Sequence, residues 1–96
     1  MEYLRCLPYV LRFEENNQSW RVDDREYRHI GSVKLTNAQI AQFENKGVVS
    51  RDATGKPHLI ALYLDRTYLI EKQAYWLKYA ECLRILANAE MIENYD

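Results

Sequence analysis

Residues 35–49, LTNAQIAQFENKGVV, carry the sharpest local signal in the sequence, a short helix with a defined start and a defined end. Thr36 followed three residues later by Gln39 matches a capping box, in which the two residues satisfy backbone N–H groups of the first turn. Gly47 stands where a helix commonly ends on a left-handed residue. The pattern predicts a helix over 37–46 that leads directly into a strand.

Apolar residues at both ends of this helix are placed to anchor it. Leu35, just before the cap, can pack on Ile40 as a hydrophobic staple. Phe43 and Val48 occupy the two contact positions of a Schellman ending. These structural roles account for most of the stretch, so we expect the helix to serve as scaffold and to turn a polar outer face to solvent.

The sequence before this helix alternates apolar and polar residues in the manner of β-strands. We predict strands over 3–13, 20–22 and 27–35, with the polar segment 14–19 as the turn of a hairpin. Residues 24–29 remain open as strand, turn or short helix.

A second hairpin is predicted after the helix. Its strands are 48–51 and 59–64, and the intervening DATGKP supplies turn residues. Both faces of the strand 59–64 are apolar, which indicates either a central strand or one side in contact with a partner.

Residues 66–92 have the periodicity of one long helix, with a broad apolar stripe for the core. A second apolar group lies on a different side of the same helix. Its members, which we take as candidates for a protein interface, are Ile70, Ala74, Leu77 and Ile85. The alternative is that residues 1–13 pack over this group and make it part of the core.

Together these elements predict an α+β fold in a single domain spanning residues 1–96. We expect a two-layer structure: an antiparallel sheet of two hairpins, a short central helix, and a long C-terminal helix packed across the sheet. The expected order is about βββαββα. Two layers follow because the sheet and the long helix each have a wide apolar side to bury.

Composition narrows the classes of function. The 13 basic and 14 acidic residues nearly cancel and are mixed along the chain, whereas nucleic-acid binding favours clustered Lys and Arg. No apolar run approaches the roughly 20 residues of a membrane span, and the N-terminus lacks the pattern of a signal peptide. We therefore expect a cytoplasmic protein with no membrane association, in which nucleic acid is an unlikely partner and the cysteines are reduced.

No catalytic or cofactor motif emerges. The possible metal ligands Cys6, Cys82, His29 and His58 lack the spacing of a metal site. Three scattered glycines do not form a phosphate-binding loop. The sequence therefore predicts neither an enzyme nor a metal or cofactor site, and it identifies no small-molecule substrate.

The helix 37–46 followed by the hairpin 48–64 is similar in order and length to winged-helix domains, in which a recognition helix precedes a β-hairpin wing. The resemblance covers about a third of the chain and implies a DNA-binding regulator that uses both elements. The strands predicted before the helix depart from that family, which has helices there. The candidate nucleic-acid contacts on this resemblance are Asn37, Gln39, Gln42 and Lys56.

The favoured hypothesis is a small protein that acts by stoichiometric association with another protein. It would be an inhibitor, an immunity or anti-defence factor such as phages and mobile elements use, or an adaptor. The partner could also be a second copy, giving a homodimer. The eight tyrosines agree with this, since tyrosine is common at protein interfaces.

Overall fold

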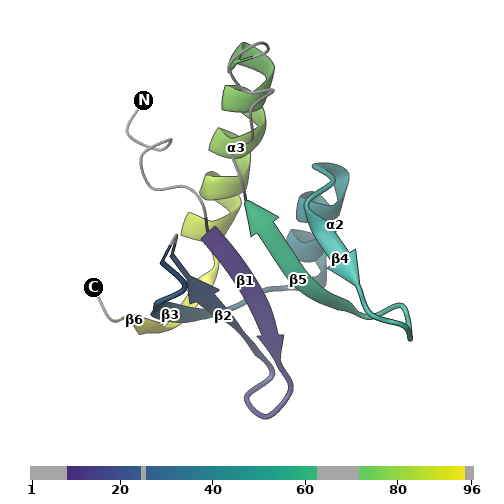
Figure 1. Cartoon of the computed structure of the whole chain (residues 1–96), viewed down its shortest axis with the longest axis vertical. Helices are drawn as coiled ribbons and strands as arrows, with labels where there is room; N and C mark the ends of the chain where they lie inside the picture. The colour runs from purple at the N-terminus through teal and green to yellow at the C-terminus, as the bar shows by residue number, and fades with distance from the viewer. Residues whose placement is uncertain (1–8, 25, 63–71, 95–96) are drawn as a thin grey trace.

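The computed structural model describes residues 9–24, 26–62 and 72–94, with the backbone alone for residues 72–79, 93 and 94. The described chain has an α+β fold with one antiparallel sheet of six strands and two helices (Figure 1). In chain order the elements are β1 (Tyr9–Glu14), β2 (Ser19–Asp23), β3 (His29–Lys34), α2 (Asn37–Asn45), β4 (Val49–Arg51), β5 (Pro57–Leu62), α3 (Lys72–Ala87) and β6 (Glu90–Asn94).

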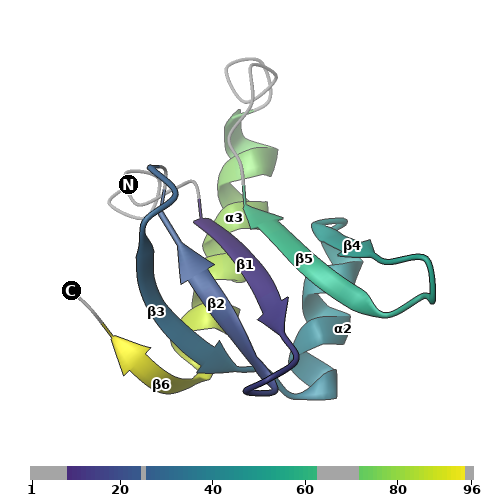
Figure 2. The ribbon, with the colours of Figure 1, turned by 60° about the horizontal axis from the view of Figure 1, so that its bottom comes forward.

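The strands lie in the order β4-β5-β1-β2-β3-β6 (Figure 2). The first three form a meander rather than a single hairpin, and the hairpin β4–β5 joins it because β5 pairs with β1. The strand predicted to be central, now β5, is paired on both sides. The predicted single antiparallel sheet is thus confirmed, and β4 and β6 are the edge strands of the sheet that the structure describes.

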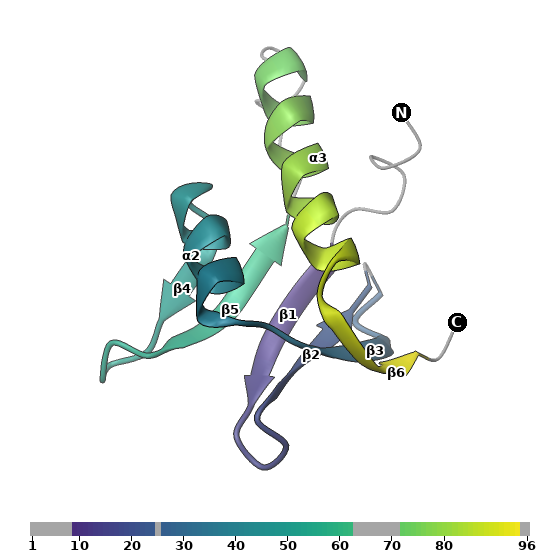
Figure 3. The same cartoon turned by 180° about the vertical axis from the view of Figure 1, so that it is seen from behind.

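Both described helices cover the same face of the sheet, which gives two layers (Figure 3). The register places Leu11 opposite Val22 on one side and opposite Ile60 on the other, so these side chains form a row beneath the helices. Phe43 from α2 and Cys82 from α3 are fully buried in the same cluster. Burial of this apolar row against the two helices is the main stabilising contribution to the fold.

The predicted capping box and left-handed residue after the short helix are confirmed, although the helix ends at Asn45, one residue earlier than predicted. The Thr36 hydroxyl accepts a hydrogen bond from the Gln39 backbone N–H, and the Gln39 side chain accepts one from the Thr36 backbone N–H. Gly47 has a φ of 73° and donates its N–H to the Glu44 carbonyl. Val48, the predicted partner of Phe43, is buried in the same core cluster.

The predicted helix 66–92 is wrong at its C-terminal end, and its first residues, 66–71, lie outside the described chain. The helix α3 stops at Ala87, where the Asn88 N–H is shared between the carbonyls of Arg84 and Ile85. Residues 90–94 then form β6, which pairs with β3. The order therefore gains a final strand, because pairing with an open sheet edge overrides the local helical periodicity.

The open question at residues 24–29 resolves as a turn before β3. The Asp24 carboxylate accepts hydrogen bonds from the backbone N–H groups of Glu26 and Arg28. Tyr27 adopts a φ of 61°, a left-handed conformation outside the region of regular β-strands. The third strand consequently starts at His29 and not at Tyr27.

Candidate functional site

The structure describes the side chain of only one of the four residues predicted to form a protein interface. Ile70 lies outside the described residues. Ala74 and Leu77 lie within α3, in the part for which the backbone alone is described. Ile85 is half-buried, packs against the core cluster and lines a cleft between α2 and α3. The apolar stripe therefore stays a prediction, except that Ile85 serves partly as core.

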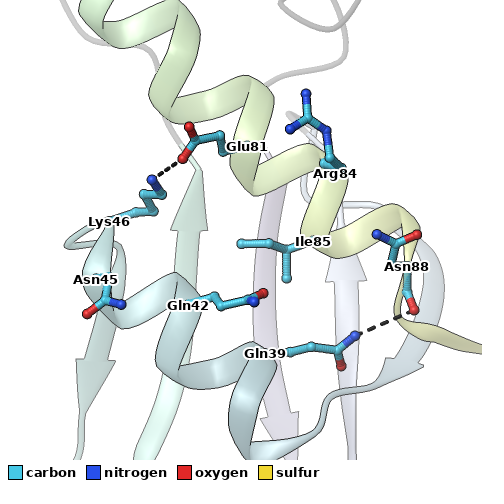
Figure 4. A pocket seen from close by; sticks show the side chains of 8 residues that line it. All are labelled: Gln39, Gln42, Asn45, Lys46, Glu81, Arg84, Ile85 and Asn88. Atoms are coloured by element: carbon cyan, nitrogen blue, oxygen red, sulfur yellow. Dashed lines mark hydrogen bonds and ion pairs between the residues drawn. The ribbon is translucent and has the colours of Figure 1, made fainter.

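The cleft between α2 and α3 has a volume of about 570 Å³ (Figure 4). In Figure 4 the Gln42 amide and the Ile85 side chain point toward each other across the middle of the gap. Seven of the eight residues that line the cleft have polar or charged side chains. The lining residues are Gln39, Gln42, Asn45, Lys46, Glu81, Arg84, Ile85 and Asn88.

Contacts between the two helices cross both ends of this cleft. The Lys46 ammonium forms an ion pair with the Glu81 carboxylate at one end. The Gln39 amide donates to the Asn88 carbonyl over 3.5 Å at the other. The hydrogen bond from Lys46, together with the charges of Lys46 and Arg84, lowers the pKa of Glu81 below its ordinary value. The cleft is thus a polar gap with a single apolar side chain, which is little to anchor a protein partner.

The four predicted nucleic-acid contacts have different surroundings. Gln39 and Gln42 line the same cleft, and Gln39 also completes the helix cap. The Lys56 ammonium lies 4.7 Å from the centre of the Phe13 ring and 3.3 Å from the Glu15 carboxylate. Asn37 is exposed at the start of α2. Nor is the hairpin β4–β5 an independent wing, because β5 is bonded to β1.

The two edges of the described sheet differ in how open they are. β4 has only three residues, and Arg51 forms two hydrogen bonds there with the Glu44 carboxylate, at 3.0 and 2.7 Å. β6 has five residues and pairs with β3 along one side, while no described strand pairs with its other side. A short, charged edge resists further pairing, whereas a longer one offers a row of backbone donors and acceptors.

Two large apolar side chains of β6 are exposed. Met91 is 56% exposed and Ile92 is 43% exposed. The pairing of β3 with β6 passes from Ser32–Glu93 to Val33–Met91, so Ile92 has no partner on β3 and the register shifts at this exposed apolar pair. The sequence interpretation missed this surface because it continued the helix to residue 92. Asn88 was a weak signal, since asparagine sometimes ends helices in the left-handed conformation, although Asn88 does not adopt a positive φ here.

The cysteines and histidines considered as metal ligands are dispersed. Cys6 lies outside the described residues, Cys82 is buried in the core, and the His29 ring nitrogen lies 3.1 Å from the Ser32 hydroxyl. His58 is exposed on β5. Throughout the described ranges, no group of three or more His, Cys, Asp or Glu residues has an arrangement that could hold a metal ion.

The described helices are too short or too polar to cross a membrane. Comparison of the chain with models of protein families, with curated proteins and with solved structures found no match.

Proposed function

We propose that this protein is a binding module that associates stoichiometrically with another protein, and that an extended segment of the partner adds to the sheet beside β6. The observation that carries the proposal is the unpaired side of β6 within the described sheet, together with the exposure of Met91 and Ile92 on it. Strand addition is a general mode of peptide recognition in which backbone hydrogen bonds supply affinity and alternate side chains supply specificity.

The chemistry of β6 favours a particular kind of partner. Its sequence, EMIEN, contains two glutamates and no basic residue. A partner strand with Lys or Arg beside apolar residues would complement these charges and cover Met91 and Ile92. A second copy of β6 would instead bring four glutamates onto two adjacent strands, which is unfavourable. The proposal therefore favours a foreign partner over a homodimer.

The test begins with affinity capture from the native host, followed by purification and titration of the captured protein. We expect Ile92→Glu to weaken binding about tenfold or more, because it replaces an apolar side chain at the centre of the proposed contact by a charge that must lose its hydration on binding. Hydrogen exchange should become slower at the backbone amides of residues 90–94 when the partner binds.

A variant in the cleft supplies the matched control. Gln42→Arg changes an exposed side chain between α2 and α3 and leaves β6 intact. Loss of binding in Gln42→Arg together with full binding by Ile92→Glu would move the interface to the cleft and overturn the proposal. Light scattering on the purified protein tests self-association: a dimer that Ile92→Glu dissociates would show that the occupant of the edge is a second copy.

A further inference from the structure

The face of the sheet opposite the helices carries an unusual pair of charges. The register places Arg12 of β1 directly opposite Arg21 of β2. Leu11 and Trp20, next to them in sequence, belong to the core beneath the helices, so alternation puts both arginines on the far face. Like charges directly opposite each other on neighbouring strands are destabilising, and the pair therefore needs a compensating feature.

Asp23 supplies that compensation. Its carboxylate accepts a hydrogen bond of 2.8 Å from Arg21 Nε and lies 3.7 Å from Arg12 Nε. The Asp23 side chain is only 6% exposed, whereas those of Arg12 and Arg21 are 52% and 37% exposed. The hydrogen bond to Asp23 and the carboxylate charge raise the pKa of Arg21 further above its ordinary value. A buried carboxylate thus orients two accessible guanidinium groups.

Among the described residues, few groups use the hydrogen-bonding capacity of these two guanidinium groups. Within the described residues, both arginines contact Asp23 through Nε, and their terminal nitrogens form no hydrogen bond with the protein. Each guanidinium has a planar fork of donors that matches the oxygens of a phosphate group. One carboxylate between two guanidinium groups also leaves this trio with a net positive charge.

Glu14 modifies the charge of this face. It lies two residues beyond Arg12 on β1, and its charge contributes to raising the pKa of Arg21. Nevertheless it forms no ion pair with either arginine in the described part of the chain. Its carboxylate would repel an anion placed between the two guanidinium groups.

We propose that Arg12 and Arg21 form a binding site for a phosphate-type oxyanion, with Asp23 as the positioning residue that holds the two guanidinium groups in place. The ligand chemistry is a phosphoryl group, either free phosphate or the phosphate of a larger molecule. The site is built from β1 and β2, whereas the protein-binding proposal uses β6. The two proposals therefore stand or fall separately.

The test is a calorimetric titration of the whole chain with inorganic phosphate at constant ionic strength, repeated with phenyl phosphate to separate free phosphate from phosphate esters. We expect saturable binding that Arg21→Gln weakens about tenfold or more, as for the loss of a charge-assisted contact. Arg21→Lys keeps the charge but removes the fork, and it should weaken binding nearly as much. Glu14→Gln should tighten binding several-fold, since it removes a repulsive charge.

The matched control is Arg84→Gln, which removes an exposed arginine from α3, on the helix side of the molecule. It should leave phosphate affinity unchanged, and circular dichroism should show every variant folded. The proposal is overturned if phosphate does not saturate the folded wild-type protein. It is equally overturned if Arg84→Gln weakens binding as much as Arg21→Gln, or if Arg21→Lys binds like the wild type, because attraction to net charge would then explain the result.

Discussion

The Asp23 carboxylate offers the sharpest test of how charge is arranged on the far face of the sheet. Replacing it by asparagine keeps the size of the side chain and an oxygen that can accept from Arg21 Nε, but it removes the negative charge. Arg12 and Arg21, opposite each other in the register, would then face one another with only the charge of Glu14 to offset their repulsion. We expect Asp23→Asn to destabilise the fold while leaving it intact.

The expected loss of stability in Asp23→Asn has two contributions, the weaker hydrogen bond to Arg21 and the repulsion between the two arginines. A hydrogen bond to a charged partner contributes about 1.5–3 kcal/mol, and a neutral acceptor retains roughly half of that. Two unit charges at a separation of about 6 Å, taken as an illustrative value, repel by about 0.7 kcal/mol in water and about 3 kcal/mol at an effective dielectric constant of about 20. Because both arginines are substantially exposed, the energy of their repulsion should lie near the lower of these two values. The expected loss in the free energy of unfolding is about 2 kcal/mol.

Urea unfolding at low and at high salt measures this loss. The gap between wild type and Asp23→Asn should narrow at about 1 M salt, where the screening length is only about 3 Å. Glu15→Gln is the control, since Glu15 is 76% exposed in its ion pair with Lys56 and should change stability by less than about 0.5 kcal/mol. A change that small for Asp23→Asn, or a large change that does not respond to salt, would refute the argument that Asp23 offsets the repulsion of the two arginines.

Three further outcomes are expected. Phe43→Ala should lower the free energy of unfolding by about 3–5 kcal/mol in urea titrations, because the ring is fully buried beneath α2; a loss below about 1 kcal/mol would contradict that packing. Gly47→Ala should cost about 1 kcal/mol by thermal unfolding through backbone strain alone, since an added Cβ meets nothing within 4 Å at a φ of 73°; an unchanged or raised melting temperature would exclude the left-handed helix end. Because Lys46 lowers the pKa of Glu81 in the folded state, the stability from this pair is present above the unfolded pKa and is lost as the pH falls through the lower folded pKa. Acid titration of stability below about pH 5 should therefore be shallower for Glu81→Gln than for wild type, and identical curves would show that the pair contributes nothing.

The elements predicted best are those specified by neighbouring residues. Thr36 and Gln39 form the predicted capping box, and Gly47 has the predicted left-handed conformation. These interactions span only a few positions along the chain, so their geometry is contained in the sequence itself. The α+β class also follows from local periodicity, since strands and helices repeat at different intervals.

The errors lie where a distant strand decides the outcome. Residues 88–92 continue the helical periodicity of α3, yet β3 leaves an edge with which residues 90–94 pair. The expected single antiparallel sheet is confirmed, but its strand order was not predicted, because β1 accepts β5 as a neighbour as well as β2. The sequence of residues 90–94 does not indicate that they pair with β3, and the sequence of β5 does not indicate that it pairs with β1.

The candidate surfaces also divide into features that the sequence indicates and features that only strand pairing creates. Sequence periodicity directed attention to the apolar stripe of the last helix, whereas the exposed residues Met91 and Ile92 emerged only when β6 was placed at the edge of the sheet. The charges of Arg12, Arg21 and Asp23 are plain in the sequence, but their juxtaposition depends on the register between β1 and β2. The sequence by itself determined the local helix ends, the class of fold and the polarity of each segment. The tertiary structure decided which strands became edges and which charges became neighbours, because strand pairing joins residues that no local interaction connects.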